Sequence, residues 1–391
     1  MIGLDRHLDE DRLVRDLCAL VATASVNPFD APPERGSRER EIAAVYRARL
    51  EELGLEPMCE EVVPGRPNLW ARLPGTGGGP TIMLAGHLDT VGVEGCEAPF
   101  AGDVRDGRVY GRGACDMKAG LAAFLEVLEI LRAGGVRLRG DLIVAALCDE
   151  EHLMLGSRAF AVAADFAIVA EPTRLAVCRC HNGQLTYLIR THGQAAHSSR
   201  PEHGRNAIVA MGRVIAALDA HADALREREP HPLAGTPRLS PGVIRGGTIS
   251  STVPDLCELE IDRRITPGET REDVVAELHA VIGPVAARAP AFEYDVVGPK
   301  LDVASLETPA DAAIVGALAT AHEHVLGRPA EIAAFPGGTD APNLRGVAVV
   351  CGPGDAAQAH TVDEWVEIAQ VVAAVRVYLH AIIQLDQARP A

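Results

Sequence analysis

The first half of the chain alternates short apolar runs with segments of helical spacing, and this alternation most constrains the fold. Apolar runs over 81–86, 142–148 and 166–170 have the length of buried strands. Residues 11–23 and 118–133 instead place leucine or valine every three or four positions, as amphipathic helices do. Strands that alternate with helices favour a largely parallel sheet covered by helices, so we expect an α/β fold.

From about residue 182 the pattern changes. The segments read strand, helix, strand, strand, helix and strand, over 184–191, 206–218, 243–249, 256–265, 271–287 and 291–297. This order is the split βαβ arrangement of ferredoxin-like domains. The α/β pattern then returns with a helix, an apolar run and a helix, over 310–326, 347–351 and 362–385. We therefore expect an α/β domain formed by residues 1–181 and 298–391, interrupted by a small α+β domain over 182–297.

Composition excludes several classes of function. The chain has 37 Lys+Arg against 54 Asp+Glu, a net charge of −17, which disfavours nucleic acid as a partner. No apolar run approaches the roughly 18 residues that span a bilayer, and the charged N-terminal segment lacks a signal peptide's apolar core. The nine cysteines contain no CxxC pattern, so we expect reduced thiols and a cytoplasmic protein.

Histidine and acidic side chains follow the apolar runs of the expected sheet. Open α/β sheets bind their ligands beyond the carboxyl ends of their strands. The residues at these positions are His87 and Asp89, Glu150 and Glu151, Glu171 and, after a glycine-rich turn, His360. Asp116 lies in a loop, residues 111–118, that opens a helix. The pattern therefore brings six candidates and this loop to one edge of the sheet.

Each of these residues alone has an ordinary structural explanation. His87 fits a hydrogen-bonded core histidine, and His360 fits an exposed loop histidine. Asp116 fits a helix N-cap, and an acidic pair such as Glu150 and Glu151 is usually solvated. Their shared position favours a metal site, because a metal needs its ligands in one place whereas surface charge does not.

Charge balance favours two metals. Two neutral imidazoles and three carboxylates carry −3, and two divalent cations with one hydroxide carry +3, so the site is neutral as burial requires. Imidazole and carboxylate ligands without thiolate suit a catalytic zinc site with open positions. Paired metals lie roughly 3.5–4 Å apart and share a carboxylate and a water.

Taken together, these segments resemble the co-catalytic zinc acylase and carboxypeptidase family, which includes acetylornithine deacetylase, succinyl-diaminopimelate desuccinylase, aminoacylase and glutamate carboxypeptidases. The matching segments are His87-Leu88-Asp89, residues 111–118, Glu150-Glu151, Glu171-Pro172-Thr173 and residues 352–361, in order along nearly the whole chain. The resemblance implies a zinc-peptidase-like α/β catalytic domain, an inserted ferredoxin-like dimerisation or lid domain, and a homodimer.

The resemblance also implies the metal ligands. Asp116 is expected to bridge two Zn²⁺ ions. His87 and Glu171 would complete one metal, and Glu151 and His360 the other. Co²⁺ and Mn²⁺ suit the same ligands.

The resemblance further implies that two other acids serve catalysis. Asp89 would hydrogen-bond the far nitrogen of His87 and fix its tautomer. Glu150 would be the general base, which takes a proton from the bridging water and hands it to the leaving amine.

Other family positions imply substrate contacts. His197 matches a histidine that reaches across the dimer to stabilise the oxyanion, although an ordinary loop histidine remains the alternative. Arg264 matches the position that grips the substrate carboxylate, while strand alternation points Arg263 to the opposite face. Gly338 and Thr339 lie in a loop that resembles the family's substrate-side loop.

Three departures from relatives bear on the substrate. Ser251 stands where relatives often carry Asn, and residues 152–157 are bulkier than the usual turn. Glu171, where the aminopeptidase and dipeptidase branches have Asp, favours the acylase and carboxypeptidase side.

The function expected is hydrolysis of an N-acyl amino acid, such as an N-acetyl or N-succinyl diamino acid, or of a dipeptide. One alternative is a carboxypeptidase that releases a C-terminal acidic residue. The other is a metal-binding protein without hydrolytic activity. Glu150 discriminates against the latter, because binding alone has no use for a second carboxylate beside Glu151.

Overall fold

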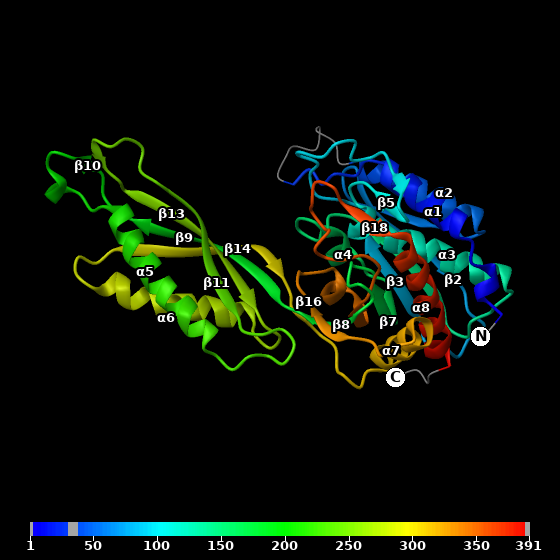
Figure 1. The fold of residues 1–391 in the computed structure, drawn as a ribbon. Helices are drawn as coiled ribbons and strands as arrows, with labels where there is room; N and C mark the ends of the chain where they lie inside the picture. Colours follow the sequence, from blue (N-terminus) through cyan, green and yellow to red (C-terminus); the bar gives the residue numbers. More distant parts are fainter. Residues whose placement is uncertain (1–2, 30–37, 388–391) are drawn as a thin grey trace. The chain divides into compact units, whose positions relative to one another are not determined.

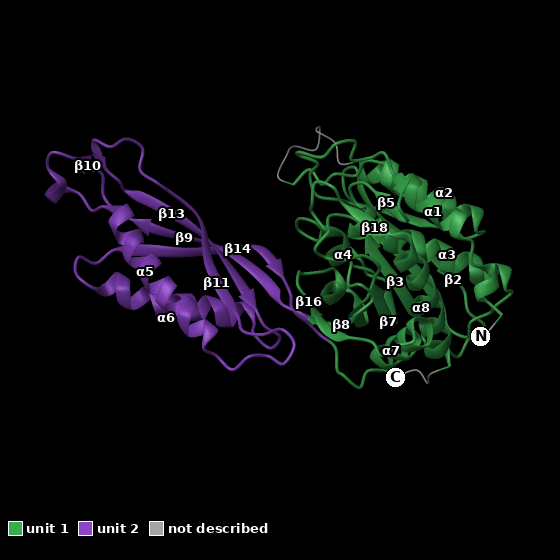
Figure 2. Cartoon of the chain, viewed as in Figure 1, with its two compact units in different colours: residues 1–180, 308–391 green, residues 181–307 purple. Residues whose placement is uncertain are grey.

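The computed structural model describes residues 3–29 and 38–387 (Figure 1). The chain divides into two compact units (Figure 2): unit 1 contains residues 1–180 and 308–391, and unit 2 contains residues 181–307. Unit 2 ends beyond residue 297, because the strand β14 (Glu293–Val303) continues to pair with β9 (Gly183–His192) as far as Val303. The predicted α/β fold with an interrupting α+β segment is confirmed.

The main sheet of unit 1 has a parallel centre. Its strands are ordered β1 (Met58–Val63), β2 (Arg66–Leu73), β6 (Leu142–Leu147), β3 (Ile82–His87), β7 (Ala163–Val169), β17 (Arg345–Val350) and β8 (Val177–His181), and β16 (Ile332–Phe335) also pairs with β8. The central strands β6, β3, β7 and β17 run parallel, whereas β2 and β8 join them antiparallel. Strands β3 and β6 are buried along their whole length, which explains their continuous apolar runs.

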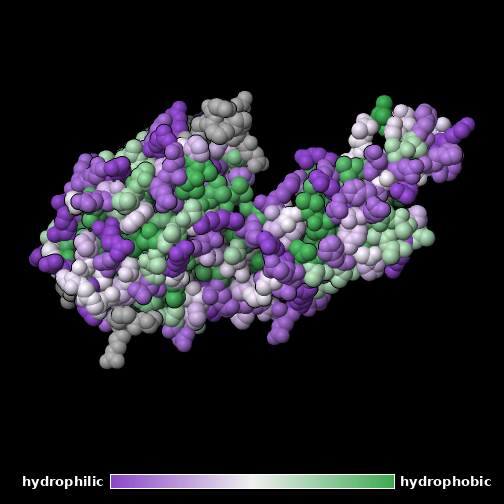
Figure 3. Space-filling model, turned by 180° about the vertical axis from the view of Figure 1, so that it is seen from behind, coloured by the Kyte–Doolittle hydropathy of each residue, from purple (hydrophilic) through white to green (hydrophobic). Residues whose placement is uncertain are grey.

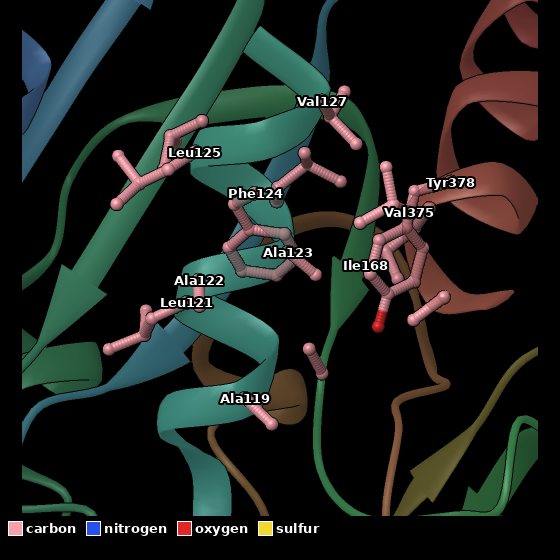
Figure 4. Close-up of a cluster of buried hydrophobic side chains, with 14 of the residues drawn as sticks. Ala119, Leu121, Ala122, Ala123, Phe124, Leu125, Val127, Ile168, Val375 and Tyr378 are labelled. Carbon is pink, nitrogen blue, oxygen red and sulfur yellow. The ribbon is translucent and has the colours of Figure 1, made fainter. Parts of the chain in front are cut away.

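Helices α3 (Ala119–Ala133) and α8 (Ile368–Asp386) pack against each other and against β3. Phe124 of α3 lies 5.5 Å from Tyr378 of α8, between ring centroids, in the core (Figure 4). The same core includes α1 (Glu10–Ala22), α2 (Glu39–Glu52) and α7 (Ala313–Leu326), and the short α4 (Leu155–Ala159) follows β6. Among the described residues, α8 alone has the length and composition of a membrane span, but it is mostly buried, as a core helix is.

One predicted helix starts later than expected, because its first residues belong to a small separate sheet. The helix expected over 362–385 begins only at Ile368, because β18 (Trp365–Glu367) pairs with β5 (Arg108–Tyr110), which also pairs with β4 (Asp103–Arg105). The Arg108 guanidinium stacks 3.7 Å from the centroid of the Trp365 ring, which favours this pairing.

Unit 2 has its own sheet and its own core. Four antiparallel strands are ordered β11 (Arg238–Gly246), β13 (Leu256–Ile265), β9 and β14, the order of a ferredoxin-like sheet. Helices α5 (Ala207–Arg226) and α6 (Arg271–Ala287) pack on it around a separate hydrophobic cluster. A short pair, β10 (Ala196–His197) with β12 (Thr252–Val253), carries His197, and β15 (Leu306–Glu307) ends the unit.

Candidate active site

The carboxyl ends of the parallel strands in unit 1 bring the first group of predicted residues together. His87 is the last residue of β3, and Glu171 follows β7 by two positions. The Nε2 atom of His87 lies 3.2 Å from Oδ1 of Asp116 and 3.8 Å from Oε2 of Glu171. All three side chains are largely buried. One imidazole and two carboxylates therefore face one another.

A second group forms on the other side of Asp116. The Nε2 atom of His360 lies 3.4 Å from Oδ2 of Asp116 and 3.1 Å from Oε2 of Glu151. The two oxygens of Asp116 thus face two different histidines, as a bridging ligand requires. Ligand atoms of His87, Asp116 and Glu151 all lie within 4.8 Å of one another.

Unsatisfied polar atoms show that these residues fit a bound cation. Oε1 of Glu151 and Oε1 of Glu171 are buried and have no hydrogen-bond partner among the described residues. Burial raises the pKa of Glu171 to about 8, and burial with the Asp116 charge raises the pKa of Glu151 to about 7. Hydrogen bonds to Asp116 and Glu151 raise the pKa of His360 to about 10. A divalent cation would replace the protons that these crowded groups otherwise share.

Asp89 contacts His87 differently from the prediction. Nδ1 of His87 lies 2.9 Å from the main-chain oxygen of Asp89, but 3.6 Å from its carboxylate. The carbonyl accepts from Nδ1–H, which leaves the Nε2 lone pair for a metal. The carboxylate of Asp89 instead accepts from the main-chain N–H groups of Glu150 and Glu151, each at 3.1 Å. Asp89 therefore fixes the backbone that carries the expected base.

Glu150 lies in a strongly acidic environment. Burial raises the pKa of Glu150 well above its usual value, and the charges of Glu171, Asp340 and Glu151 add to this effect. A base near such groups binds a proton firmly enough to deliver it later to a leaving group. Asp340 is itself buried, with a pKa raised to about 7 mainly by that burial.

A family model described as peptidase family M20/M25/M40 matches residues 83–384. The chain belongs to this family. Acetylornithine deacetylases are among its relatives. The protein of that name from Proteus mirabilis is 34% identical over 366 residues, which cover 90% of each chain. The protein of that name from Edwardsiella ictaluri is 34% identical over 367 residues, which cover 90% of this chain and 92% of the relative. The protein is therefore a metal-dependent hydrolase, as predicted, and the alternative of a non-hydrolytic metal-binding protein is set aside.

Solved structures show the same fold. An aminopeptidase from Bacillus cereus superposes with a TM-score of 0.78 at 21% identity, covering 98% of this chain and 100% of the other. A Bacillus subtilis protein described as a dinuclear metal-binding peptidase of the M20 family gives a TM-score of 0.70 at 17% identity, covering 96% of this chain and 97% of the other.

Behind the site of this M20 hydrolase lies a buried polar network that the sequence analysis missed. Nδ2 of Asn27 donates to Oδ2 of Asp89 at 2.7 Å and to Oδ1 of Asp149 at 3.0 Å. Nη1 of Arg66 lies 2.7 Å from Oδ1 of Asp149, and Arg66 also pairs with Glu39. No local pattern identifies these residues, because their partners are distant in sequence.

Glu364 is a second residue that the sequence analysis missed. It is almost fully buried and accepts hydrogen bonds from the loop that carries Asp116. The sequence placed Glu364 in the first turn of an expected helix, where an acidic residue is ordinary.

The predicted substrate residues lie in both units. In unit 2, His197 is exposed and its Nδ1 lies 2.8 Å from Oγ of Ser199. Arg264 is partly exposed, whereas Arg263 is fully buried and paired with Glu269 at 2.6 Å, so the two side chains do alternate. In unit 1, Thr339 is buried and Gly338 is partly exposed.

Proposed function

We propose that this hydrolase is a dizinc deacylase that cleaves the amide bond of an N-acyl amino acid. The observation that carries the proposal is the position of Asp116, whose two carboxylate oxygens face His87 and His360 separately. Relatives named acetylornithine deacetylase support an N-acetylated diamino acid as the substrate. The free state of all nine cysteines supports the proposed cytoplasmic location.

The ligand assignment follows from the contacts. His87 and Glu171 would hold one cation, Glu151 and His360 would hold the other, and Asp116 would contact both. Zn²⁺ is the proposed ion, with Co²⁺ or Mn²⁺ as ions that suit the same donors. When bound, the cations would lower the pKa of a coordinated water and polarise the scissile carbonyl.

Glu150 would move the proton. Its carboxylate accepts a proton from the attacking water while the water oxygen bonds to the carbonyl carbon. Glu150 then returns that proton to the amine nitrogen as the C–N bond breaks. The second proton of the water stays on the new carboxyl group, so the immediate products are an amine and a carboxylic acid, and the acid then becomes a carboxylate by losing this proton to the amine or to solvent. The raised pKa of Glu150 favours the first step, in which the carboxylate takes the proton from water.

Substrate binding and assembly complete the proposal. Arg264 would grip the substrate carboxylate, Gly338 and Thr339 would line the substrate side, and His197 of one protomer would stabilise the oxyanion in the other. A homodimer formed through unit 2 is therefore part of the proposed function. Unit 2 carries exposed apolar side chains on β11 and α5, among them Ile244 and Val209, and apolar patches are visible on the molecular surface (Figure 3).

The variant Glu150→Gln tests the general base. We expect it to keep its metal content and to lose at least roughly 10²–10⁴-fold in kcat. Glu151→Gln is the matched control, because it should lose bound metal as well as activity. Metal analysis by mass spectrometry and initial rates would separate the two. A Glu150→Gln enzyme with wild-type rates would contradict the assignment.

A substrate screen tests the reaction class. N-acetyl, N-succinyl and N-carbamoyl amino acids and dipeptides would be offered to the protein with added Zn²⁺ or Co²⁺. We expect the fastest release of amine from an N-acetyl diamino acid. Preference for dipeptides with a C-terminal acidic residue would instead establish the carboxypeptidase alternative.

A further inference from the structure

Glu364 binds one loop through four hydrogen bonds. Its Oε1 accepts from the main-chain N–H of Cys115 at 2.8 Å and of Asp116 at 2.9 Å. Its Oε2 accepts from the main-chain N–H of Gly113 at 3.1 Å and from Nη1 of Arg112 at 2.6 Å. The side chain is only 1% exposed. A single carboxylate therefore accepts hydrogen bonds from three main-chain N–H groups within residues 113–116.

The loop needs this carboxylate because its amides have no helical partners. Gly113 has a left-handed backbone with φ of 84°, and Asp116 has an extended backbone with φ −117° and ψ 94°. Buried main-chain N–H groups without acceptors are costly, and the first N–H groups of a helix have no acceptor within the helix, so the Glu364 carboxylate supplies the acceptors for Gly113, Cys115 and Asp116. With its amide turned toward Glu364, Asp116 directs its side chain toward His87 and His360.

The same segment also carries the other histidine. Trp365 of β18 pairs with Tyr110 of β5, and the main-chain N–H of Gly111 donates to the main-chain oxygen of Glu364 at 2.9 Å. His360 lies four residues before Glu364 on this segment. One strand pairing thus fixes the distance between the Asp116 loop and the His360 loop.

We propose that Glu364 is a positioning residue that sets the orientation of Asp116 between the two histidines. Its role is exerted through the backbone of residues 113–116 and not through contact with substrate. The proposal rests on the proposed assignment of Asp116 as the shared metal ligand.

Two substitutions separate geometry from charge. Glu364→Gln places an amide NH₂ against donors in either orientation, since both oxygens of Glu364 accept from N–H groups. Glu364→Asp keeps the charge but is one methylene too short to reach both sides of the loop. Both variants would be stripped of metal and titrated with Zn²⁺ in competition with a chromophoric chelator. We expect each to bind Zn²⁺ roughly 10–100-fold more weakly than wild type.

The spectrum of bound Co²⁺ distinguishes a change in metal coordination from a simple loss of protein stability. The visible absorption of Co²⁺ reports its coordination, so reoriented Asp116 oxygens should change the spectrum of the fully loaded variants. Arg112→Lys is a milder variant, because it perturbs the Arg112–Glu364 pair and the contacts of Arg112 with Gly92 and Cys96 but leaves the three main-chain hydrogen bonds to Glu364. We expect Arg112→Lys to bind Zn²⁺ with an affinity between those of wild type and the Glu364 variants. If the Glu364 variants do not fold, this variant still tests the proposal.

Glu126→Gln is the matched control. Glu126 is as buried as Glu364 and accepts from the main-chain N–H of Asp9 at 2.8 Å and from Arg12 at 2.7 Å. It lies on α3, ten residues after Asp116 in the chain, and its hydrogen-bond partners Asp9 and Arg12 lie outside the loops that carry the expected ligands. We expect a lower Tm with unchanged Zn²⁺ affinity and an unchanged Co²⁺ spectrum.

The outcomes distinguish this inference from the proposed function. Wild-type Zn²⁺ affinity and Co²⁺ spectrum in folded Glu364→Gln or Glu364→Asp protein would overturn the positioning role. An effect of Glu364→Gln that Glu364→Asp does not share would show that charge alone matters, which also overturns it. Asp116→Asn tests the underlying assignment separately: retention of both metals in that variant would refute the shared ligand itself.

Discussion

Arg66 pairs with two fully buried carboxylates, Asp149 and Glu39, beside the expected general base. Replacing it with methionine would remove the positive charge that pairs with both buried acids, and breaking such a buried pair costs about 3–5 kcal/mol. We therefore expect Arg66→Met to lower the free energy of unfolding by that amount, measured by urea denaturation of the metal-free protein. Arg40→Met is the control, because the exposed pair of Arg40 with Glu61 contributes less than about 1 kcal/mol. Equal losses in the two variants would contradict the argument.

His181 links stability to pH. Burial lowers its pKa to about 4, against about 6.5 in an unfolded chain. Below pH 6.5, His181 is therefore protonated in the unfolded state but stays neutral in the folded state. Its contribution to the free energy of unfolding is complete above pH 6.5 and is lost as the pH falls toward 4. Between pH 7.5 and pH 5 this amounts to about 2 kcal/mol. In urea denaturation of the metal-free proteins, the free energy of unfolding should fall by about 2 kcal/mol less in His181→Gln than in wild type between pH 7.5 and pH 5. Equal losses in the two proteins would show that His181 does not titrate as described.

The residues that could be predicted from sequence share one property. His87 ends a buried parallel strand, and Glu151 and Glu171 follow two others, so a local pattern places them at one edge before any contact is known. Asn27 and Glu364 have no such pattern, since each acts through hydrogen bonds to residues far away in the chain. Long-range polar contacts of this kind become visible only in the folded molecule.

At the scale of elements, Gly120 shows why α3 can approach β7 closely. A Cβ at Gly120 would lie 2.5 Å from Cβ of Ala170, the residue before the expected ligand Glu171. We expect Gly120→Ala to be destabilising despite the better helix propensity of alanine, because overpacking costs about 1–3 kcal/mol. Gly316→Ala on α7, where a Cβ meets nothing within 4 Å, should instead stabilise by about 0.5–1 kcal/mol. Thermal unfolding of the pair gives the comparison, and stabilisation of Gly120→Ala would refute the close approach.

Elements were predictable where local pattern and tertiary contacts agree. The strand over 256–265 and the helix over 271–287 have the predicted bounds, the helix being held by a capping box between Thr270 and Asp273. The helix expected over 362–385 was wrong at its start, because pairing with β5 overrides the apolar spacing of residues 365–367. Tertiary strand pairing of this kind cannot be inferred from helical periodicity.

At the scale of the whole molecule, the two units have separate hydrophobic clusters. The cluster of unit 2 draws only on its own sheet and helices, and a domain with its own core can fold alone. We therefore expect a fragment of residues 183–303, from the start of β9 to the end of β14, to unfold cooperatively in circular dichroism. A fragment without a cooperative transition would show that unit 2 depends on the rest of the chain.

Exposed apolar side chains at one edge of the unit 2 sheet favour a homodimer. Strand β11 is an outer strand with Val243 and Ile244 exposed, and α5 exposes Ile208 and Val209. Natural proteins rarely leave a long apolar edge strand uncovered, because it pairs readily with another chain. Since the proposed function needs His197 from a second protomer, we expect β11 and α5 to form the dimer surface.

Ile244→Lys tests this surface in the full-length protein. The added charge at β11 should shift the protein from dimer to monomer in sedimentation equilibrium and, because His197 would then be missing from the site, lower kcat while Zn²⁺ content stays unchanged. Val297→Lys is the matched control on the opposite edge strand β14, where Val297 is 39% exposed against 52% for Ile244. It should leave the dimer intact. A monomeric Ile244→Lys enzyme with full activity would show that His197 of a second protomer is not needed for catalysis. Loss of the dimer in Val297→Lys alone would show that the interface lies on β14.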